Sequence, residues 1–436
     1  MSVNEAGKLL SEWKGDTYLF GLNLLENIGK ITKKIGSKSI LVGTSSKWAE
    51  KHMKTIINSL EKEGIIFNKI IGAKPNCPRE DLYRIALCIA YNKPESVVVF
   101  GGGSSIDCVK AATVLATYSQ EEAIKTLKVP WYSAGTIDPY FGTGMITEMV
   151  EATGKNPIPV ISVQSASGSA AHLTKYSNIT DPVEGQKKLI VDDAIVPKYS
   201  IFDYQVTEAS PRDLTLDGAL DGIAHIWEVF MGASGNPSYD KIKEISVLGF
   251  NLIINHLKSA IEGNLESRVA LGMGTDLGGY AIMIGGTNGP HLGSFSLVDI
   301  LTHGRACAIL YPYYTVFFAP RIEDQLSNIL PIFEEAGYIK RIDNTEIKNQ
   351  ELGILVARAM IKFNSSLGFP TTLKEAGASY EHLERMLEAA KDPQLKMKLQ
   401  NMPVPLVPEE GDIDVYMRSI LEAAYIGKFE SIILKN

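Results

Sequence analysis

The residues best suited to chemistry are one aspartate and three histidines in the second half of the 436-residue chain. Asp221 and His225 are four residues apart in a helical pattern, so both side chains face the same side of one helix. His291 follows a glycine-rich stretch, and His303 precedes Gly304. One carboxylate and three imidazoles suit a divalent first-row metal, iron foremost and zinc as the alternative. The pattern predicts these four residues as metal ligands and catalytic centre, although an i, i+4 pair can also be structural.

A glycine-rich turn is the second feature with chemical potential. It follows an apolar run and opens a helical pattern, so its free backbone N–H groups suit a pyrophosphate. It is neither a Walker A loop nor a GxGxxG motif, and a tight turn without a ligand is the alternative. Asp107 is expected to cap the helix or hold a nearby hydroxyl. The predicted phosphate-binding residues are Gly101, Gly102, Gly103 and Ser104.

A second turn of small residues follows another apolar run, at 158–163. Two such turns at strand ends of one sheet are typical of a dinucleotide site. Ser165, Ser167 and Ser169 are therefore predicted to contact the cofactor. His172, just beyond, faces either the cofactor or solvent, whereas His52, His256 and His382 lie among charged or amphipathic helical residues and are interpreted as structural.

Alternating strands and helices must position the turns. The pattern predicts a parallel sheet with helices on its faces. From about residue 208 long helical patterns dominate. We expect an α/β dinucleotide-binding domain at 1–205 and an all-helical metal-binding domain at 206–436. The expected strands are 39–43, 65–71, 96–100 and 158–163, the expected helices are 47–62, 80–90, 213–231 and 238–261, and 131–156 is interpreted as a loop or β excursion.

Composition excludes several classes of protein. A net charge of −7 argues against a nucleic-acid or anionic-membrane partner. Four cysteines without a CxxC pair form no disulfide framework. The sequence has no run of about 18 apolar residues, so no membrane span is predicted. The polar first residues lack the apolar core of a signal peptide, so we expect a cytoplasmic protein.

Together these motifs resemble the iron-containing, or group III, alcohol dehydrogenase family. The similarity covers nearly the whole chain. It is carried by Gly101–Asp107, Asp221–His225, Pro290–Gly293 with His303–Gly304, and Leu367–Lys374, and by Tyr18–Gly21 at the start. The chain departs from the family at Val163–Ala170. The family has a Thr-Thr-Ala-Gly-Thr-Gly-Ser-Glu element there, and this chain lacks two of its threonines and its glutamate.

The resemblance implies a dehydroquinate synthase-like, two-domain fold. It implies a metal held by Asp221, His225, His291 and His303, and a homodimer. Lys187 or Lys188 matches a family lysine near the cofactor, and Lys188 is taken as the prediction. The implied activity is metal-dependent hydride transfer between NAD(P)(H) and a small alcohol or carbonyl. The alternatives are a glycerol dehydrogenase-like polyol oxidoreductase, a dehydroquinate synthase-like cyclase, and a metal- or nucleotide-binding protein without turnover.

Cofactor choice depends on the turn after the first sheet strand of the pattern. NAD-preferring family members carry an aspartate there, and such a carboxylate repels a 2′-phosphate. This chain has Thr44, Ser45 and Ser46 instead, followed by Lys47. Three hydroxyls and a cation suit phosphate oxygens, so NADP is expected to be accepted and preferred over NAD. The alternative is that the serines only cap the next helix.

Overall fold

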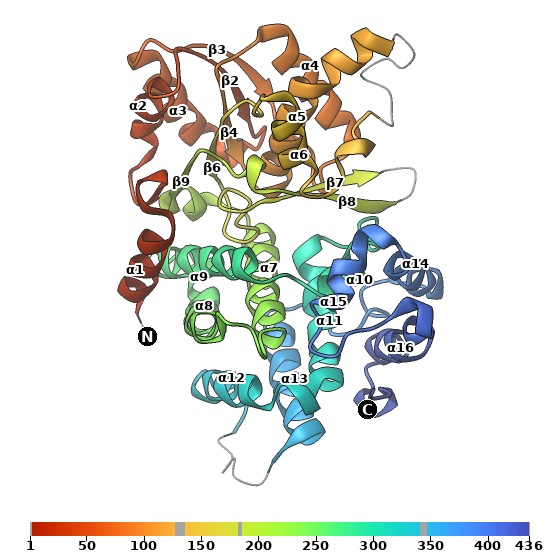
Figure 1. Cartoon of the computed structure of the whole chain (residues 1–436). Coiled ribbons are helices and arrows are strands. Elements are labelled where there is room, and N and C mark those ends of the chain that lie inside the picture. The colour runs from red at the N-terminus through yellow and green to blue at the C-terminus, as the bar shows by residue number, and fades with distance from the viewer. Residues whose placement is uncertain (1, 127–135, 182–184, 341–346, 436) are drawn as a thin grey trace. The chain divides into compact units, whose positions relative to one another are not determined.

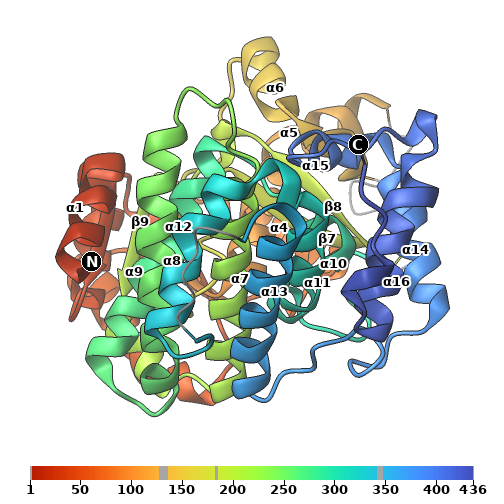
Figure 2. The same ribbon diagram turned by 90° about the horizontal axis from the view of Figure 1, so that it is seen from below.

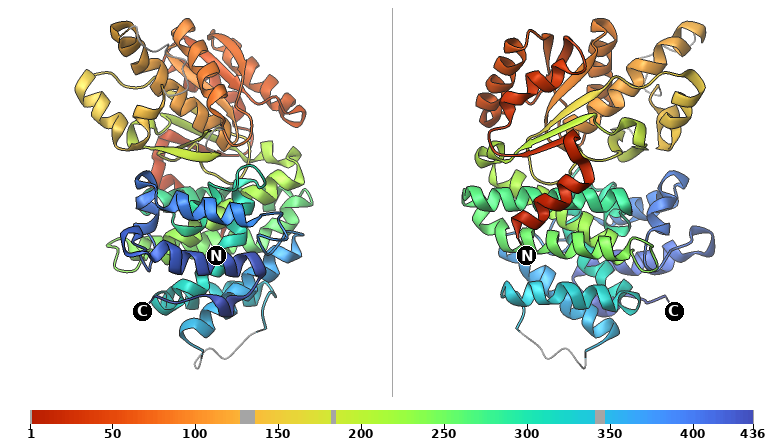
Figure 3. Two further views of the ribbon diagram at one scale, coloured as in Figure 1. Left: turned by 90° about the vertical axis from the view of Figure 1, so that its right-hand side faces the viewer. Right: turned by 60° about the vertical axis from the view of Figure 1, so that its left-hand side comes forward.

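The computed structural model describes residues 2–126, 136–181, 185–340 and 347–435. The chain divides into two compact units, one of Ser11–Pro211 and one that joins Met1–Leu10 to Arg212–Asn436. The first turns of helix α1 (Val3–Lys14) therefore belong with the helical C-terminal unit, so that both chain termini lie in that unit (Figure 3).

A six-stranded parallel sheet forms the centre of the first unit, in the order β1-β9-β6-β4-β2-β3. The central strands are short apolar runs buried on both faces, as strands of a helix-covered parallel sheet must be. The predicted parallel α/β unit is thus confirmed. Its strands are β1 (Tyr18–Gly21), β2 (Lys38–Gly43), β3 (Ile66–Ile71), β4 (Ser96–Gly101), β6 (Val160–Gln164) and β9 (Tyr199–Asp203).

Alternating side chains of β4 divide the core into two layers. Val97 and Val99 pack with helices α4 (Arg79–Asn92) and α5 (Gly103–Thr126). Val98 and Phe100 pack on the other face with α2 (Ile28–Lys33) and α3 (Glu50–Lys62). Successive residues of a strand point to opposite faces, so one apolar run binds both helix layers (Figure 1).

Strand order places a topological switch point between β2 and β4. From β2 the chain moves to β3 on one side, then returns to form β4 on the other. Gly43 pairs with Phe100, and Gly101 with Gln164, so the three carboxyl ends lie at one edge. Open parallel sheets bind nucleotides at such a point. The serine and glycine turns predicted to bind cofactor begin here.

Two features of the first unit differ from the sequence-based expectation. A small second sheet consists of β5 (Gly142–Thr143), β8 (Gln186–Val191) and β7 (Tyr176–Asp181). Strand β5 agrees with the β excursion expected within 131–156, whereas β7 and β8 were not predicted. The loop interpretation of 131–156 was wrong at Met145–Thr153, which forms helix α6; residues 131–135 lie outside the described chain.

A distant side chain explains α6. The carboxylate of Asp192 accepts hydrogen bonds from the backbone N–H groups of Ile146 and Thr147, both at 2.8 Å. It satisfies the free donors of the helix start, where no local residue caps the helix. A local pattern does not reveal such a cap.

The second unit is helical throughout its described part, as predicted. Helix α7 is surrounded by neighbours and contacts α8, α9 and α11 (Figure 2). No helix among the described residues is both long and apolar enough to cross a membrane. The helices that matter below or frame them are α7 (Arg212–Met231), α8 (Tyr239–Ile261), α9 (Leu265–Ile284), α10 (Gly289–Ser294), α11 (His303–Phe318), α12 (Glu323–Glu335), α13 (Asn349–Ser366), α14 (Tyr380–Ala390), α15 (Lys396–Gln400) and α16 (Arg418–Ile426).

Candidate metal centre

Helix α7 presents three polar side chains on one face of its second half, residues 219–231, which is otherwise apolar and buried. Asp221, His225 and Glu228 recur at intervals of four and three residues, which is one stripe of an α-helix. All three are buried, and Glu228 is fully so. Polar groups are costly in a core, so a stripe of them indicates a site rather than packing.

The start of α11 is pressed against α7. A Cβ on Gly304 would lie 1.9 Å from the carbonyl oxygen of Asp217, so only glycine allows this approach. Asp217 also accepts hydrogen bonds from Arg305 Nε at 3.0 Å and Thr302 Oγ1 at 2.8 Å. These contacts fix His303, the first residue of α11, opposite Asp221.

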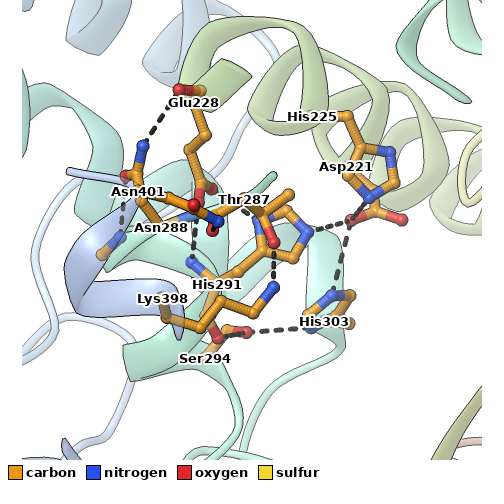
Figure 4. A network of polar contacts seen from close by, with 11 residues as sticks. Asp221, His225, Glu228, Thr287, Asn288, His291, Ser294, His303, Lys398 and Asn401 are labelled. Carbon is orange, nitrogen blue, oxygen red and sulfur yellow. Dashed lines mark hydrogen bonds and ion pairs between the residues drawn. The ribbon is translucent and has the colours of Figure 1, made fainter. Parts of the chain in front are cut away.

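The four predicted ligands come together around one carboxylate oxygen. Asp221 Oδ1 lies 3.7 Å from His225 Nε2, 3.7 Å from His291 Nε2 and 3.6 Å from His303 Nε2 (Figure 4). These separations are longer than hydrogen bonds. Donor atoms held about 2.0–2.2 Å from one tetrahedral ion stand roughly 3.3–3.6 Å apart. The spacing therefore fits a shared metal.

The protonation pattern fits as well. Asp221 Oδ1 is buried and makes no hydrogen bond to any described residue. Burial lowers the pKa of His225 to about 4, so that imidazole is neutral near pH 7. A buried carboxylate oxygen and a neutral imidazole are the states that bind metal.

Hydrogen bonds to the far side of two rings set their tautomers. His291 Nδ1 lies 2.5 Å from Glu228 Oε1, and His303 Nδ1 lies 2.9 Å from Ser294 Oγ. Ser294 Oγ donates its proton to the carbonyl oxygen of His291, so it accepts from His303. A carboxylate also accepts. We therefore assign the protons to both Nδ1 atoms, which leaves each Nε2 lone pair directed at Asp221.

Glu228 is held by a buried network of polar contacts. Its Oε2 accepts from the backbone N–H of Asn288 at 2.5 Å, and burial raises its pKa to about 7. The buried ammonium of Lys398 opposes that rise and donates to Thr287 Oγ1. Asn401 donates to the carbonyl oxygen of Thr287 at 3.1 Å. The C-terminal segment thus holds the network that orients His291 (Figure 4).

Glu228→Gln is expected to weaken metal binding by about 10–100-fold, the usual effect of losing a carboxylate behind a histidine ligand. Glutamine keeps the shape but removes the charge that polarises His291. Competition with a chromogenic chelator measures the affinity. Glu388→Gln, an exposed site on α14, should leave it unchanged. If Glu228→Gln binds metal as tightly as the wild type, the imidazole of His291 needs no carboxylate behind it in order to bind metal.

The two small-residue turns of the first unit lie against each other. Ser165 N donates to the carbonyl oxygen of Gly101 at 3.0 Å. A Cβ on Gly103 would lie 2.6 Å from Ser169 Oγ, so glycine there permits the contact. Ser167 is buried next to them. The structure thus joins the predicted Gly101–Ser104 turn with the Ser165–Ser169 turn at the switch point.

Other predicted cofactor residues have defined contacts. Thr44 and Ser46 are partly buried, Ser45 is exposed, and all three directly follow β2. The prediction that Asp107 caps α5 was wrong: it lies inside the helix, and its Oδ2 accepts from Asn178 N at 3.0 Å, which ties α5 to β7. Lys188 Nζ lies 3.6 Å from Asp181 Oδ2.

Lys187 and His172 are both buried in the first unit. Lys187 is buried, and its charge acts on Asp107. Neighbouring residues of a strand face opposite sides, so only one of Lys187 and Lys188 faces α5. His172 is fully buried, with Nε2 3.3 Å from Tyr18 Oη, so of its two expected positions the solvent-facing one was wrong.

Sequence reasoning missed several polar residues that lie around the predicted ligands. Glu228, Ser294 and Cys307 each follow a predicted ligand by three or four residues on the same helix, which is a usable signal. Lys398 had no such signal, because it comes from a distant segment that only the tertiary fold brings to Thr287.

Comparisons with known proteins agree with this arrangement. The profile described as "Iron-containing alcohol dehydrogenase" matches residues 16–204, and that described as "Fe-containing alcohol dehydrogenase family, C-terminal" matches residues 215–407. The long-chain-alcohol dehydrogenase 1 of Geobacillus thermodenitrificans is 25% identical, over 93% of this chain and 94% of its own. The NADPH-dependent butanol dehydrogenase of Clostridium saccharobutylicum is 24% identical, over 85% and 87%.

Solved structures share the fold. An archaeal halo-thermophilic alcohol dehydrogenase from a Red Sea brine pool superimposes with a TM-score of 0.77 at 22% identity, over 93% of this chain and 96% of that one. The two profiles follow one another along the chain as the sheet unit and the helical unit do. This chain is therefore a member of the iron-containing alcohol dehydrogenase family, whose enzymes are oxidoreductases that use a metal and a nicotinamide cofactor.

Proposed function

We propose that this chain moves a hydride between NADP(H) and a small alcohol or aldehyde at a divalent metal held by Asp221, His225, His291 and His303. The observation that carries the proposal is the convergence of three imidazole Nε2 atoms on Asp221 Oδ1, at 3.6–3.7 Å. When bound, the metal would supply a Lewis acid and the nicotinamide a hydride donor or acceptor.

The chain's own residues support this chemistry in defined ways. Asp221 would supply the negative charge of the centre, and the neutral imidazole of His225 a lone pair. Glu228 and Ser294 hold two of the rings in the binding tautomer. No described side chain takes the role of a general base in the proposal, so water carries the substrate proton.

The cofactor half of the proposal places the pyrophosphate on the Gly101–Ser104 turn. Helix α5 begins at Gly103, so its first backbone N–H groups and its positive dipole end are at that turn. Ser165, Ser167 and Ser169 line the neighbouring turn. Lys188, whose Nζ lies 3.6 Å from Asp181 Oδ2, stays the predicted cofactor-facing lysine of β8, with Lys187 as the alternative.

A substrate panel tests the activity. The names of relatives point to long-chain alcohols, butanol and 1,3-propanediol as their substrates, so the panel spans those lengths as alcohols and aldehydes. Purified, metal-loaded protein is expected to change the absorbance of the reduced nicotinamide with at least one of them. Cofactor binding with no turnover on any of them would favour a binding protein and reject the enzyme.

Thr44→Asp is expected to shift the ratio of kcat/KM for NADP over NAD by at least about tenfold toward NAD, roughly 1.4 kcal/mol. An aspartate would repel the 2′-phosphate. Ser46 makes no side-chain capping bond to the turn that begins at Lys47. Thr44 Oγ1 instead accepts from the Ser46 backbone N–H at 3.2 Å and donates to Ser46 Oγ at 3.1 Å, which gathers the two hydroxyls at one turn. Thr44→Asn, which adds no charge, is the control. A wild-type preference for NAD that Thr44→Asp does not alter would refute the NADP assignment.

The cellular setting remains part of the proposal. The four cysteines, all in the described chain, form no disulfide, which supports a reducing compartment such as the cytoplasm. The homodimer expected from the resemblance stays a prediction.

A further inference from the structure

Cys307 lies one helical turn beyond His303, on α11. One ligand atom from each of Asp221, His291, His303 and Cys307 lies within 4.8 Å of all the others. This tight group includes a thiol and leaves out His225. Cys307 has no CxxC partner and was not in the donor set expected from the sequence, although it follows His303 by four residues.

The position of the thiol follows from the packing of α11. Residues four apart share a helix face, so Cys307 faces the same way as His303. Gly304, between them, lets this part of α11 lie directly on α7. Cys307 is fully buried, and so is the Asp221 Oδ1 atom that makes no hydrogen bond to a described residue. A small thiol at this place points into the centre rather than filling a gap in the apolar core.

The distances suit coordination by sulfur. Zinc binds cysteine sulfur at about 2.3 Å and imidazole nitrogen at about 2.0–2.1 Å, so such donors on one tetrahedral ion stand roughly 3.6 Å apart. The ligand atoms of the group lie within 4.8 Å of one another, so the side chains have to close in by up to about 1.2 Å to share one ion. Coordination breaks the S–H bond, forms a sulfur–metal bond and releases the proton to water.

We propose that Cys307 Sγ is a ligand of the metal in this chain, and that it shifts the preference of the centre from ferrous iron toward zinc. The proposal rests on the proposed function only in requiring a metal at Asp221. Thiolate is a soft ligand that selects zinc over harder ions in mixed donor sets. The centre thus combines oxygen, nitrogen and sulfur donors.

Cobalt(II) substitution of the full-length protein tests the ligand. A thiolate bound to cobalt gives a sulfur-to-metal charge-transfer band in the near ultraviolet, which oxygen and nitrogen ligands do not. We expect this band in the wild type and its loss in Cys307→Ser, with cobalt still bound by elemental analysis. Cys88→Ser, on α4 in the other unit, is the matched control and should keep the band. The ratio of zinc to iron affinity should fall at least about tenfold in Cys307→Ser.

The outcomes separate this inference from the proposed function. Bound cobalt without the band in the wild type overturns the Cys307 ligand and leaves the metal centre standing. A band that persists in Cys307→Ser does the same. A wild type that binds no cobalt overturns the centre itself. If Cys307→Ser does not fold, X-ray absorption of the zinc-loaded wild type decides, because the ligand requires a sulfur scatterer at about 2.3 Å and its absence refutes it.

Discussion

Asp221→Ala is expected to lose its metal and at least about a thousandfold in kcat, while the protein stays folded. Lewis-acid stabilisation by a metal amounts to several kcal/mol, and each 1.36 kcal/mol is about tenfold in rate. Asp221 is the residue on which every other donor converges. Elemental analysis and steady-state kinetics measure the two losses.

The thermal stability of the metal-free and metal-bound proteins provides a second test of the role of Asp221. In the metal-free protein Asp221 Oδ1 is a buried oxygen that makes no hydrogen bond to any residue the structure describes, so its removal leaves no hydrogen-bond partner of that atom unsatisfied. Metal-free Asp221→Ala should therefore melt at or above the Tm of metal-free wild type, whereas metal should raise the Tm of the wild type alone. Asp240→Ala, exposed on α8, should retain both metal and activity. Full metal occupancy in Asp221→Ala would refute the centre.

Gly102→Val is expected to weaken cofactor binding by about a hundredfold and to leave metal binding intact. A Cβ on Gly102 meets no protein atom within 4 Å, and its φ is not in the left-handed region, so the side chain has room in the protein itself. The loss then arises from the ligand, because a side chain there keeps the phosphate from the backbone N–H groups, and hydrogen bonds to a charged group contribute about 1.5–3 kcal/mol each. Calorimetric titration with NADPH gives the affinity.

A graded pair of variants controls for folding effects. Gly102→Ala should lose less affinity than Gly102→Val, because its side chain is smaller. Gly103→Ala should instead disturb the fold, since its Cβ would lie 2.6 Å from Ser169 Oγ. Equal affinities for Gly102→Val and the wild type would remove the pyrophosphate from this turn.

The sheet unit was largely predictable because its strands are local signals. The run at 39–43 is observed as Lys38–Gly43 and the run at 96–100 as Ser96–Gly101, since β-branched residues between glycine or proline leave few alternatives. Helix α6 was missed because Asp192 supplies its cap from a distant segment. Strands β7 and β8 of the second sheet were missed because they carry polar residues such as Lys187 and Asn178.

The metal centre was predictable to the extent that helical spacing encodes it. Asp221 and His225 share a face by their separation alone, and the same rule reaches Glu228. The meeting of α7 with the start of α11 depends on Gly304, whose role is visible only once Asp217 is known to lie beside it. The contact of Lys398 with Thr287 joins segments with no common pattern, so only the fold reveals it.

Deuterium transfer tests the central claim most directly. Metal-loaded protein is given an aldehyde that it reduces and NADPH deuterated at C4 on the transferred face, and the alcohol is examined by mass spectrometry. The account predicts one deuterium on the carbinol carbon of each product molecule, and no product from metal-free protein or from Asp221→Ala. Two results would contradict metal-dependent hydride transfer. One is an alcohol without deuterium whichever face of C4 carries the label, and the other is equal turnover by metal-free protein.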